Sequence, residues 1–225
     1  MTEQKKYARV REAIKDKETL IAENLKNTGL SFDNLNILLV AFKAEDELLL
    51  YVKKKNETTY KILLTYGVCA RSGQLGPKRK QGDYQVPEGF YHINIFNPTS
   101  NFFLSLGINY PNLSDKRKSK AHDLGGNIFI HGSCVTIGCL PMTDDKIKEI
   151  YLYAAHAKKN GQLKIPVYIF PFRMTDQNFN VYKAQYKDEV SLIDFWTNLK
   201  DGYDKFETEK RELKVSVAAN GDYIF

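Results

Sequence analysis

The stretch "IFIHGSCVTIGCLPMT", residues 128–143, decides how this chain is interpreted, because it holds two of the three cysteines and one of the four histidines. An apolar run ends in His131-Gly132, and Cys139 follows Gly138 after a short segment. Thr143 is a typical N-cap, and the two aspartates after it favour the positive start of a helix. The stretch therefore predicts a strand, a tight turn that carries a thiol, and a helix.

Short apolar runs separated by charged, Asn-containing or Gly/Pro-rich turns surround this stretch and predict further strands. The predicted strands are 36–43, 47–54, 59–68, 90–96, 102–108, 128–132 and 165–172, with a last one in "LKVSVAA" near the C-terminus. Helical spacing of apolar residues predicts helices over 4–28, 143–159 and 188–209. These elements predict a mainly β fold with flanking helices (α+β), built as a twisted, mostly antiparallel β-sandwich or barrel.

The order of the elements divides the chain into three parts. Residues 1–30 form an N-terminal helix packed on the core, residues 36–172 form the core itself, and residues 173–225 form a helix–strand extension. A chain of 225 residues is long enough to bury one sizeable core in this way.

The composition limits the classes of partner that the protein is expected to bind. The net charge of +6 favours anionic partners, but the basic residues are scattered and no zinc finger or RNA-binding signature is present, so nucleic acid is not expected. No run approaches the ~18 apolar residues that span a membrane. The first residues lack the apolar segment of a signal peptide, so the chain is either cytosolic or a mature form whose leader has been removed.

The cysteines and the histidine allow several interpretations. A zinc site would need more ligands than His131, Cys134 and Cys139, whose spacing lacks the usual CxxC pair. A Cys134–Cys139 disulfide would close a very tight loop, whereas Cys69 with Cys134 is sterically open and leaves Cys139 free. All three cysteines could also be small buried hydrophobes.

A thiol nucleophile is the remaining interpretation, and the local geometry favours it. Gly138 supplies a permissive backbone, and His131 at a strand end could face Cys139 across a loop that doubles back. Such a pair predicts that the pKa of the thiol lies well below the ~8.5 of an ordinary cysteine.

"IFIHG" followed by "TIGCLPM" resembles the signature of the L,D-transpeptidase catalytic domain (YkuD-type), in which a strand ends in His-Gly and a later [Ser/Thr]-x-Gly-Cys bears the nucleophile. "GDYQVPEGFY" at 82–91 is similar to the family's Gly-Asp-x-x-x-Pro-Glu-Gly-x-Tyr segment, and the compressed "HGSCVTIGC" resembles the YafK-like branch. The resemblance covers about residues 37–172. Two positions depart from it: Ile137 and Pro141 stand where the family usually has a histidine and an arginine.

The resemblance implies cysteine-dependent acyl-enzyme chemistry on peptidoglycan stem peptides, in the periplasm or cell envelope, with the leader removed. It implies Cys139 as nucleophile and His131 as base and later acid, with the Gly132 carbonyl orienting the imidazole. The backbone N–H groups of Gly138 and Cys139 are the expected oxyanion-hole donors. No metal or cofactor is expected.

The sequence does not determine which bond of the stem peptide is cleaved or which group accepts the acyl part. We expect hydrolysis of an amide at the meso-diaminopimelate centre, as by a murein amidase or L,D-carboxypeptidase. The alternatives are transfer, which forms crosslinks or attaches a protein to peptidoglycan, and a catalytically inactive wall-binding module. Water is favoured as acceptor because the short segment between His131 and Cys139 leaves little chain to cap the site.

Five residues are candidates for substrate binding: Thr136, Lys78, Arg79, Tyr91 and His92. Lys78 and Arg79, or Arg71, could replace the missing arginine, although a solvated basic loop is the alternative. His92 lies on a strand expected to run near the cleft, and a core position is the alternative for it. We expect His156 at the surface or its boundary and His122 in an exposed loop.

Overall fold

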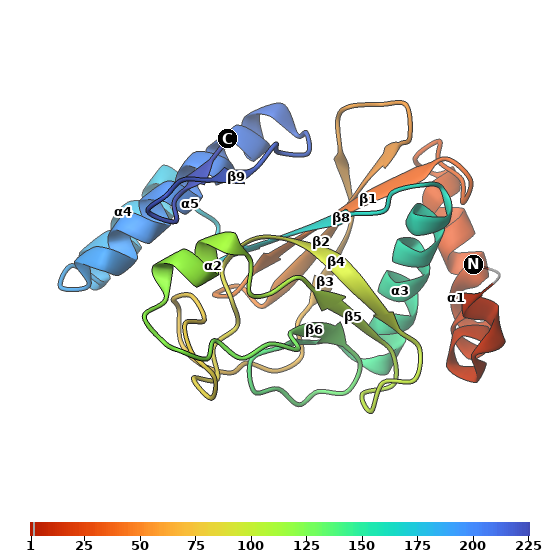
Figure 1. Ribbon diagram of the computed structural model, residues 1–225. Coiled ribbons are helices and arrows are strands. Elements are labelled where there is room, and N and C mark those ends of the chain that lie inside the picture. The colour runs from red at the N-terminus through yellow and green to blue at the C-terminus, as the bar shows by residue number, and fades with distance from the viewer. Residues whose placement is uncertain (2) are drawn as a thin grey trace.

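The computed structural model describes Met1 and residues 3–225 and is built around one curled eight-stranded sheet with the order β3-β2-β1-β8-β4-β5-β6-β7 (Figure 1). Its strands are β1 Leu35–Phe42, β2 Glu47–Lys54, β3 Lys61–Gly67, β4 Gly89–Asn97, β5 Ser105–Ile108, β6 Phe129–His131, β7 Leu140–Pro141 and β8 Ile165–Phe170. All neighbours pair antiparallel except β1 with β8 and β6 with β7. The predicted α+β class and the twisted, mostly antiparallel β-sandwich or barrel are confirmed in the form of one curled, half-barrel sheet.

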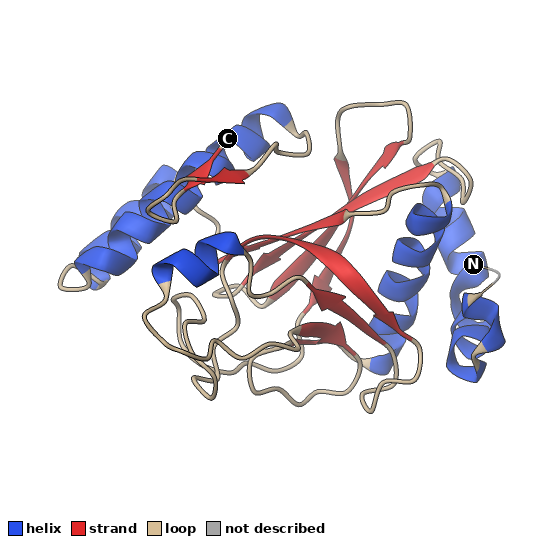
Figure 2. Ribbon diagram, in the orientation of Figure 1, coloured by secondary structure: helices blue, strands red, loops and turns tan. Residues whose placement is uncertain are grey.

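Helices cover this sheet on two sides (Figure 2). They are the short 3₁₀ helix η1 Gln4–Lys6 and the α-helices α1 Ala8–Lys26, α2 Leu113–Lys118, α3 Asp144–Lys159, α4 Asp176–Gln185 and α5 Val190–Glu209. A small hairpin, β9 Ser216–Val217 with β10 Tyr223–Ile224, lies beside α5 (Figure 1). Among the described residues, no helix is both long and apolar enough to cross a membrane.

The central strands are buried on both faces, which explains their nearly continuous apolar sequences. In β1, Ile37 and Leu39 belong to the same apolar cluster as α1 and α3, whereas Leu38 and Val40 belong to the cluster formed with α5. This alternation follows from the two-residue period of a strand. The C-terminal extension therefore covers one whole face of the central sheet.

The helix after the cysteine begins and ends as predicted. The Thr143 side chain accepts a hydrogen bond from the Lys146 backbone N–H at 3.2 Å, which caps the first turn of α3. The helix ends at Asn160, and Gly161 follows with φ +101°. α1 packs beside α3, and ion pairs such as Lys148–Glu12, at 2.7 Å, join the two helices.

Several elements differ from the sequence-based expectation, among them the two-residue strands β7 and β10, which were not predicted, and the helix predicted over 4–28, which is divided into η1 and α1. The strand predicted at 102–108 begins only at Ser105, because the chain before it turns through Phe103 with φ +67°. The short α2 was not predicted, although Asn112 and Asp115 form a capping box at its start. α4 was not predicted either, because none of its residues is buried and only the half-buried Phe179 and Tyr182 pack against the apolar cluster.

A buried ionic junction connects α5 to residues 68–88, here called the β3–β4 loop. The Glu88 carboxylate is fully buried and accepts hydrogen bonds from Lys43 Nζ at 2.9 Å and from Trp196 Nε1 at 2.9 Å. It also accepts the Gly76 backbone N–H at 2.7 Å. One carboxylate thus fixes the loop, the end of β1 and α5 together, and this loop forms one wall of the site described next.

Candidate active site

His131 and Cys139 meet because the chain doubles back between β6 and β7. The two strands are parallel neighbours, with His131 in register with Pro141, so residues 132–139 (the β6–β7 loop) return beside the start of the loop. Gly138 makes the return with φ +134°, and a side chain there would also lie 3.0 Å from the Gln85 carbonyl oxygen. His131 and Cys139 line one hollow of about 540 Å³, here called the His131 hollow.

The imidazole of His131 is held in one orientation. Its Nδ1 lies 2.5 Å from the Gly132 carbonyl oxygen, and the Phe102 ring lies over it with 4.6 Å between the ring centroids. A carbonyl oxygen can only accept, so Nδ1 carries the proton and Nε2 has a free lone pair. Burial lowers the pKa of His131, although the Gly132 hydrogen bond acts in the opposite direction, so the ring is a neutral base at pH 7.

The thiol of Cys139 is half-buried and differs from the expectation of a depressed pKa. Burial raises the pKa of Cys139, and this exceeds the lowering by a hydrogen bond with the Phe129 backbone and by the Lys78 cation. In the described part of the chain, Sγ makes a weak contact with the Asn127 carbonyl oxygen, at 3.7 Å, and no hydrogen bond joins it to the imidazole. The pair is therefore neutral at pH 7.

The other two cysteines are joined in a disulfide. Cys69 and Cys134 are bonded with 5.4 Å between their Cα atoms, and Cys139 is a free thiol. The bond fastens the β6–β7 loop to the β3–β4 loop, so the two walls of the site are covalently connected. Of the two disulfide pairings that the sequence allows, Cys69 with Cys134 is therefore the one present. Across Met1 and residues 3–225, no three His, Cys, Asp or Glu side chains are grouped to hold a metal.

Thr136 organises the turn before Cys139. Its Oγ1 accepts hydrogen bonds from the Cys139 N–H at 2.8 Å and the Gly138 N–H at 3.2 Å, and it donates to the Cys139 carbonyl oxygen at 2.9 Å. These are the two amides expected to form an oxyanion hole. In this structure both are already paired, so they become available to a substrate oxygen only if the threonine hydroxyl turns away.

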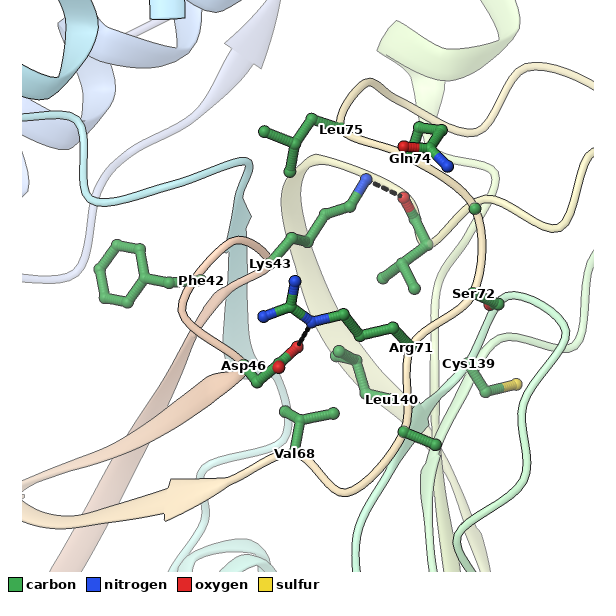
Figure 3. A pocket seen from close by; sticks show the side chains of 13 residues that line it. Phe42, Lys43, Asp46, Val68, Arg71, Ser72, Gln74, Leu75, Cys139 and Leu140 are labelled. Carbon is green, nitrogen blue, oxygen red and sulfur yellow. Dashed lines mark hydrogen bonds and ion pairs between the residues drawn. The ribbon is translucent and has the colours of Figure 1, made fainter. Parts of the chain in front are cut away.

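Two cations lie in further hollows that Cys139 also lines. Lys78 lines one of about 300 Å³, and its Nζ is 2.6 Å from Asp83. Arg71 lines another of about 120 Å³, where it pairs with Asp46 and donates to the Ala44 carbonyl oxygen at 2.9 Å (Figure 3). Its side chain is 61% exposed, so the guanidinium can still reach a ligand.

The family model described as "YkuD: L,D-transpeptidase catalytic domain" matches residues 36–169. The chain belongs to this family. It is 41% identical over 191 residues to the protein named "Putative L,D-transpeptidase YafK" in Escherichia coli strains K12 and O157:H7, and the match covers 84% of this chain and 73% of that protein. The L,D-transpeptidase family acts on peptidoglycan, so this is the polymer on which the chain acts.

Two solved structures are similar to this L,D-transpeptidase-family chain. The first is the helical cell shape determining protein Pgp2 of Campylobacter jejuni, with a TM-score of 0.48, 19% identity, and coverage of 82% of this chain and 74% of that one. The second is Bdellovibrio bacteriovorus Bd1075, with a TM-score of 0.44, 25% identity, and coverage of 61% and 48%.

Three of the predicted binding residues of this L,D-transpeptidase-family chain do not line the hollows around Cys139. Arg79 forms an ion pair with the buried Asp115 at 3.1 Å, and the Tyr91 hydroxyl donates to the same carboxylate. That buried Tyr91 has its pKa raised by burial. His92 lines a separate hollow together with Lys164.

The positions of the two remaining histidines can be compared with those expected from the sequence. His122 is exposed, as expected. The expectation for His156 is wrong: it is only 7% exposed and stacks on Phe32, with 4.2 Å between the ring centroids. The N-terminal segment covers this side of α3, which the helix's own pattern does not reveal.

Proposed function

We propose that the chain is a thiol hydrolase that cleaves an amide at the meso-diaminopimelate centre of a peptidoglycan stem peptide, in the periplasm or cell envelope. One observation carries the proposal: His131 and Cys139 line the same hollow, and Gly132 leaves His131 Nε2 as the acceptor. The net charge of +6 suits a wall polymer rich in carboxylates.

The reaction uses the thiol and the imidazole in turn. His131 Nε2 takes the Sγ–H proton as sulfur attacks the amide carbonyl, because both groups start neutral. The carbon–nitrogen bond then breaks, His131 returns the proton to the leaving amine, and an acyl thioester remains on Cys139. Water then attacks the thioester carbonyl while His131 takes one of its protons. The carbon–sulfur bond breaks, His131 returns that proton to Sγ, and the carboxylic acid and the free thiol result.

The oxyanion of this reaction requires donors. Gly138 and Cys139 can donate their N–H groups if the Thr136 hydroxyl rotates as negative charge develops on the substrate oxygen. Lys78 and Arg71 are the cations that can bind a substrate carboxylate, since both lie in hollows next to the nucleophile. Arg79 and Tyr91 then act through their contacts with Asp115 rather than on the substrate, and His92 has no part in this reaction because it lines a separate hollow.

Water is the favoured acceptor because the site is open. In the β6–β7 loop Val135 is 57% exposed and Ile137 is 74% exposed, so the loop forms a low rim beside Cys139. A thioester at this position is accessible to water.

The test uses purified tetrapeptide, crosslinked and protein-linked muropeptides with product analysis by mass spectrometry. We expect hydrolytic products from the wild type and none from Cys139→Ala or His131→Ala, with Ser133→Ala as an active control in the same loop. Normal turnover by Cys139→Ala would refute the proposed nucleophile.

Transfer is the second candidate, and the meeting of three hollows at Cys139 favours it, because an acceptor peptide could enter beside the acyl donor. New crosslinked dimers without hydrolytic products would establish transfer. An inactive wall-binding module would bind muropeptides without converting any of them.

A further inference from the structure

Charge is distributed unequally among the three hollows that meet at Cys139. The Lys78 hollow contains the Lys78 cation, which pairs with Asp83. The Arg71 hollow contains Arg71 and Lys43 together with Asp46, so two cations face one carboxylate there. Among the residues that line the His131 hollow there is no Lys, Arg, Asp or Glu. One wall of the hollow is apolar and consists of Phe102, Phe129, Val135 and Ile137. The rest of the lining is polar but uncharged apart from His131 and Cys139, and consists of Asn97, Ser100, Asn101, Ser105, Asn127 and Thr136.

The position of His131 determines which half of the substrate enters this hollow. The imidazole that takes the thiol proton must return it to the leaving nitrogen, so that nitrogen has to lie within hydrogen-bond reach of Nε2. The acyl half, with its carboxylates, then extends toward the cationic hollows on the other sides of Cys139. The amine half extends over the apolar wall.

We infer that the His131 hollow is a subsite for the leaving amine, and that it selects an amine with an apolar side chain and no carboxylate next to the nitrogen. A carboxylate in this hollow would lose water without gaining a cation, which is unfavourable. An aliphatic group would cover the exposed side chains of Val135 and Ile137, which is favourable. This inference rests on the proposed function and specifies its substrate class.

Four synthetic substrates separate the two requirements. All share the acyl part L-Ala-γ-D-Glu-meso-diaminopimelate, and the leaving amines are D-alanine, D-leucine, D-alaninamide and D-leucinamide. We expect kcat/KM to rise about tenfold from D-alaninamide to D-leucinamide, and about tenfold from each free acid to its amide. Equal values across the series, or a preference for D-alanine, would overturn the inference while leaving the hydrolase proposal intact.

Two variants locate the preference. Val135→Ser should bring the ratio of D-leucinamide to D-alaninamide turnover close to one, because Val135 lines the His131 hollow and neither of the other two. Leu163→Ser is the control, because Leu163 is 77% exposed and does not line the His131 hollow, and it should keep the wild-type ratio. An unchanged ratio in Val135→Ser would overturn the assignment of this wall.

A binding measurement keeps the inference testable if the wild type cleaves none of the four compounds. Titration of each compound into Cys139→Ala should give dissociation constants in the same order, with D-leucinamide binding tightest. If the wild type cleaves none of the compounds but the dissociation constants follow this order, the hydrolase proposal is refuted and the subsite is kept. Absence of the order would refute the subsite.

Discussion

Replacing Cys134 by Ser removes the covalent connection between the β6–β7 loop and the β3–β4 loop, and we expect a large loss of stability. The disulfide joins residues 65 positions apart. Constraining a loop of that length in the unfolded chain contributes about 4 kcal/mol to the free energy of unfolding by the chain-entropy relation. With a urea dependence of about 3 kcal/mol per molar, the unfolding midpoint should fall by roughly 1.3 M.

The assay is urea unfolding followed by the fluorescence of the single tryptophan, Trp196, which is 1% exposed in the folded chain. Both proteins carry Cys139→Ala so that no free thiol exchanges with the disulfide. Dithiothreitol should move the midpoint of the parent to that of Cys134→Ser and leave the variant unchanged. Coincident curves for parent and variant without reductant would refute the reasoning.

Two other changes test the electrostatics of buried groups. Burial lowers the pKa of His156 from 6.5 to about 4, so between these values only the unfolded chain takes up the proton and stability is lost as pH falls. His156→Phe keeps the stack on Phe32, and its free energy of unfolding relative to the wild type is measured by urea unfolding at two pH values. The advantage of the variant should be about 2 kcal/mol larger at pH 5 than at pH 7.5. An equal advantage at both pH values would contradict this. Lys78→Gln should raise the pKa of the Cys139 thiol further, because the cation favours the thiolate, and the pH dependence of alkylation measures it. Lys80→Gln, at an exposed neighbouring position, is the control, and identical profiles for the two variants would exclude the effect of Lys78.

The elements of the core were predictable because burial sets their pattern. β1 and β2 are long apolar runs, and α3 has an N-cap, an apolar face and a terminal glycine, so local sequence and tertiary structure agree. α4 lacks a buried residue, and the six-residue α2 is shorter than a periodic pattern can reveal. The curvature of the sheet and its coverage by α5 depend on contacts between distant segments.

The parts of the candidate site that are formed by residues close together in the sequence could be predicted. The parts that depend on contacts between distant segments could not. The strand ending in His131 and the glycine before Cys139 indicate a loop that doubles back, and both residues line one hollow. Arg79 is tied to Asp115, which comes from a different part of the chain, so its charge alone could not place it. The pKa of the thiol depends on burial by the whole fold and could not be derived from spacing.

The carboxylate of Glu88 has a consequence for cooperativity. It joins Lys43 of the sheet, the Gly76 amide in the wall of the site and Trp196 of α5 without contact with water. Breaking any one of these contacts leaves a charge or a polar group buried without its partner, so the three segments lose order together. Binding of a ligand against the β3–β4 loop is therefore thermodynamically coupled to the folding of α5. A chain that ended before this helix would lose both the cover of its sheet and the wall of its candidate active site.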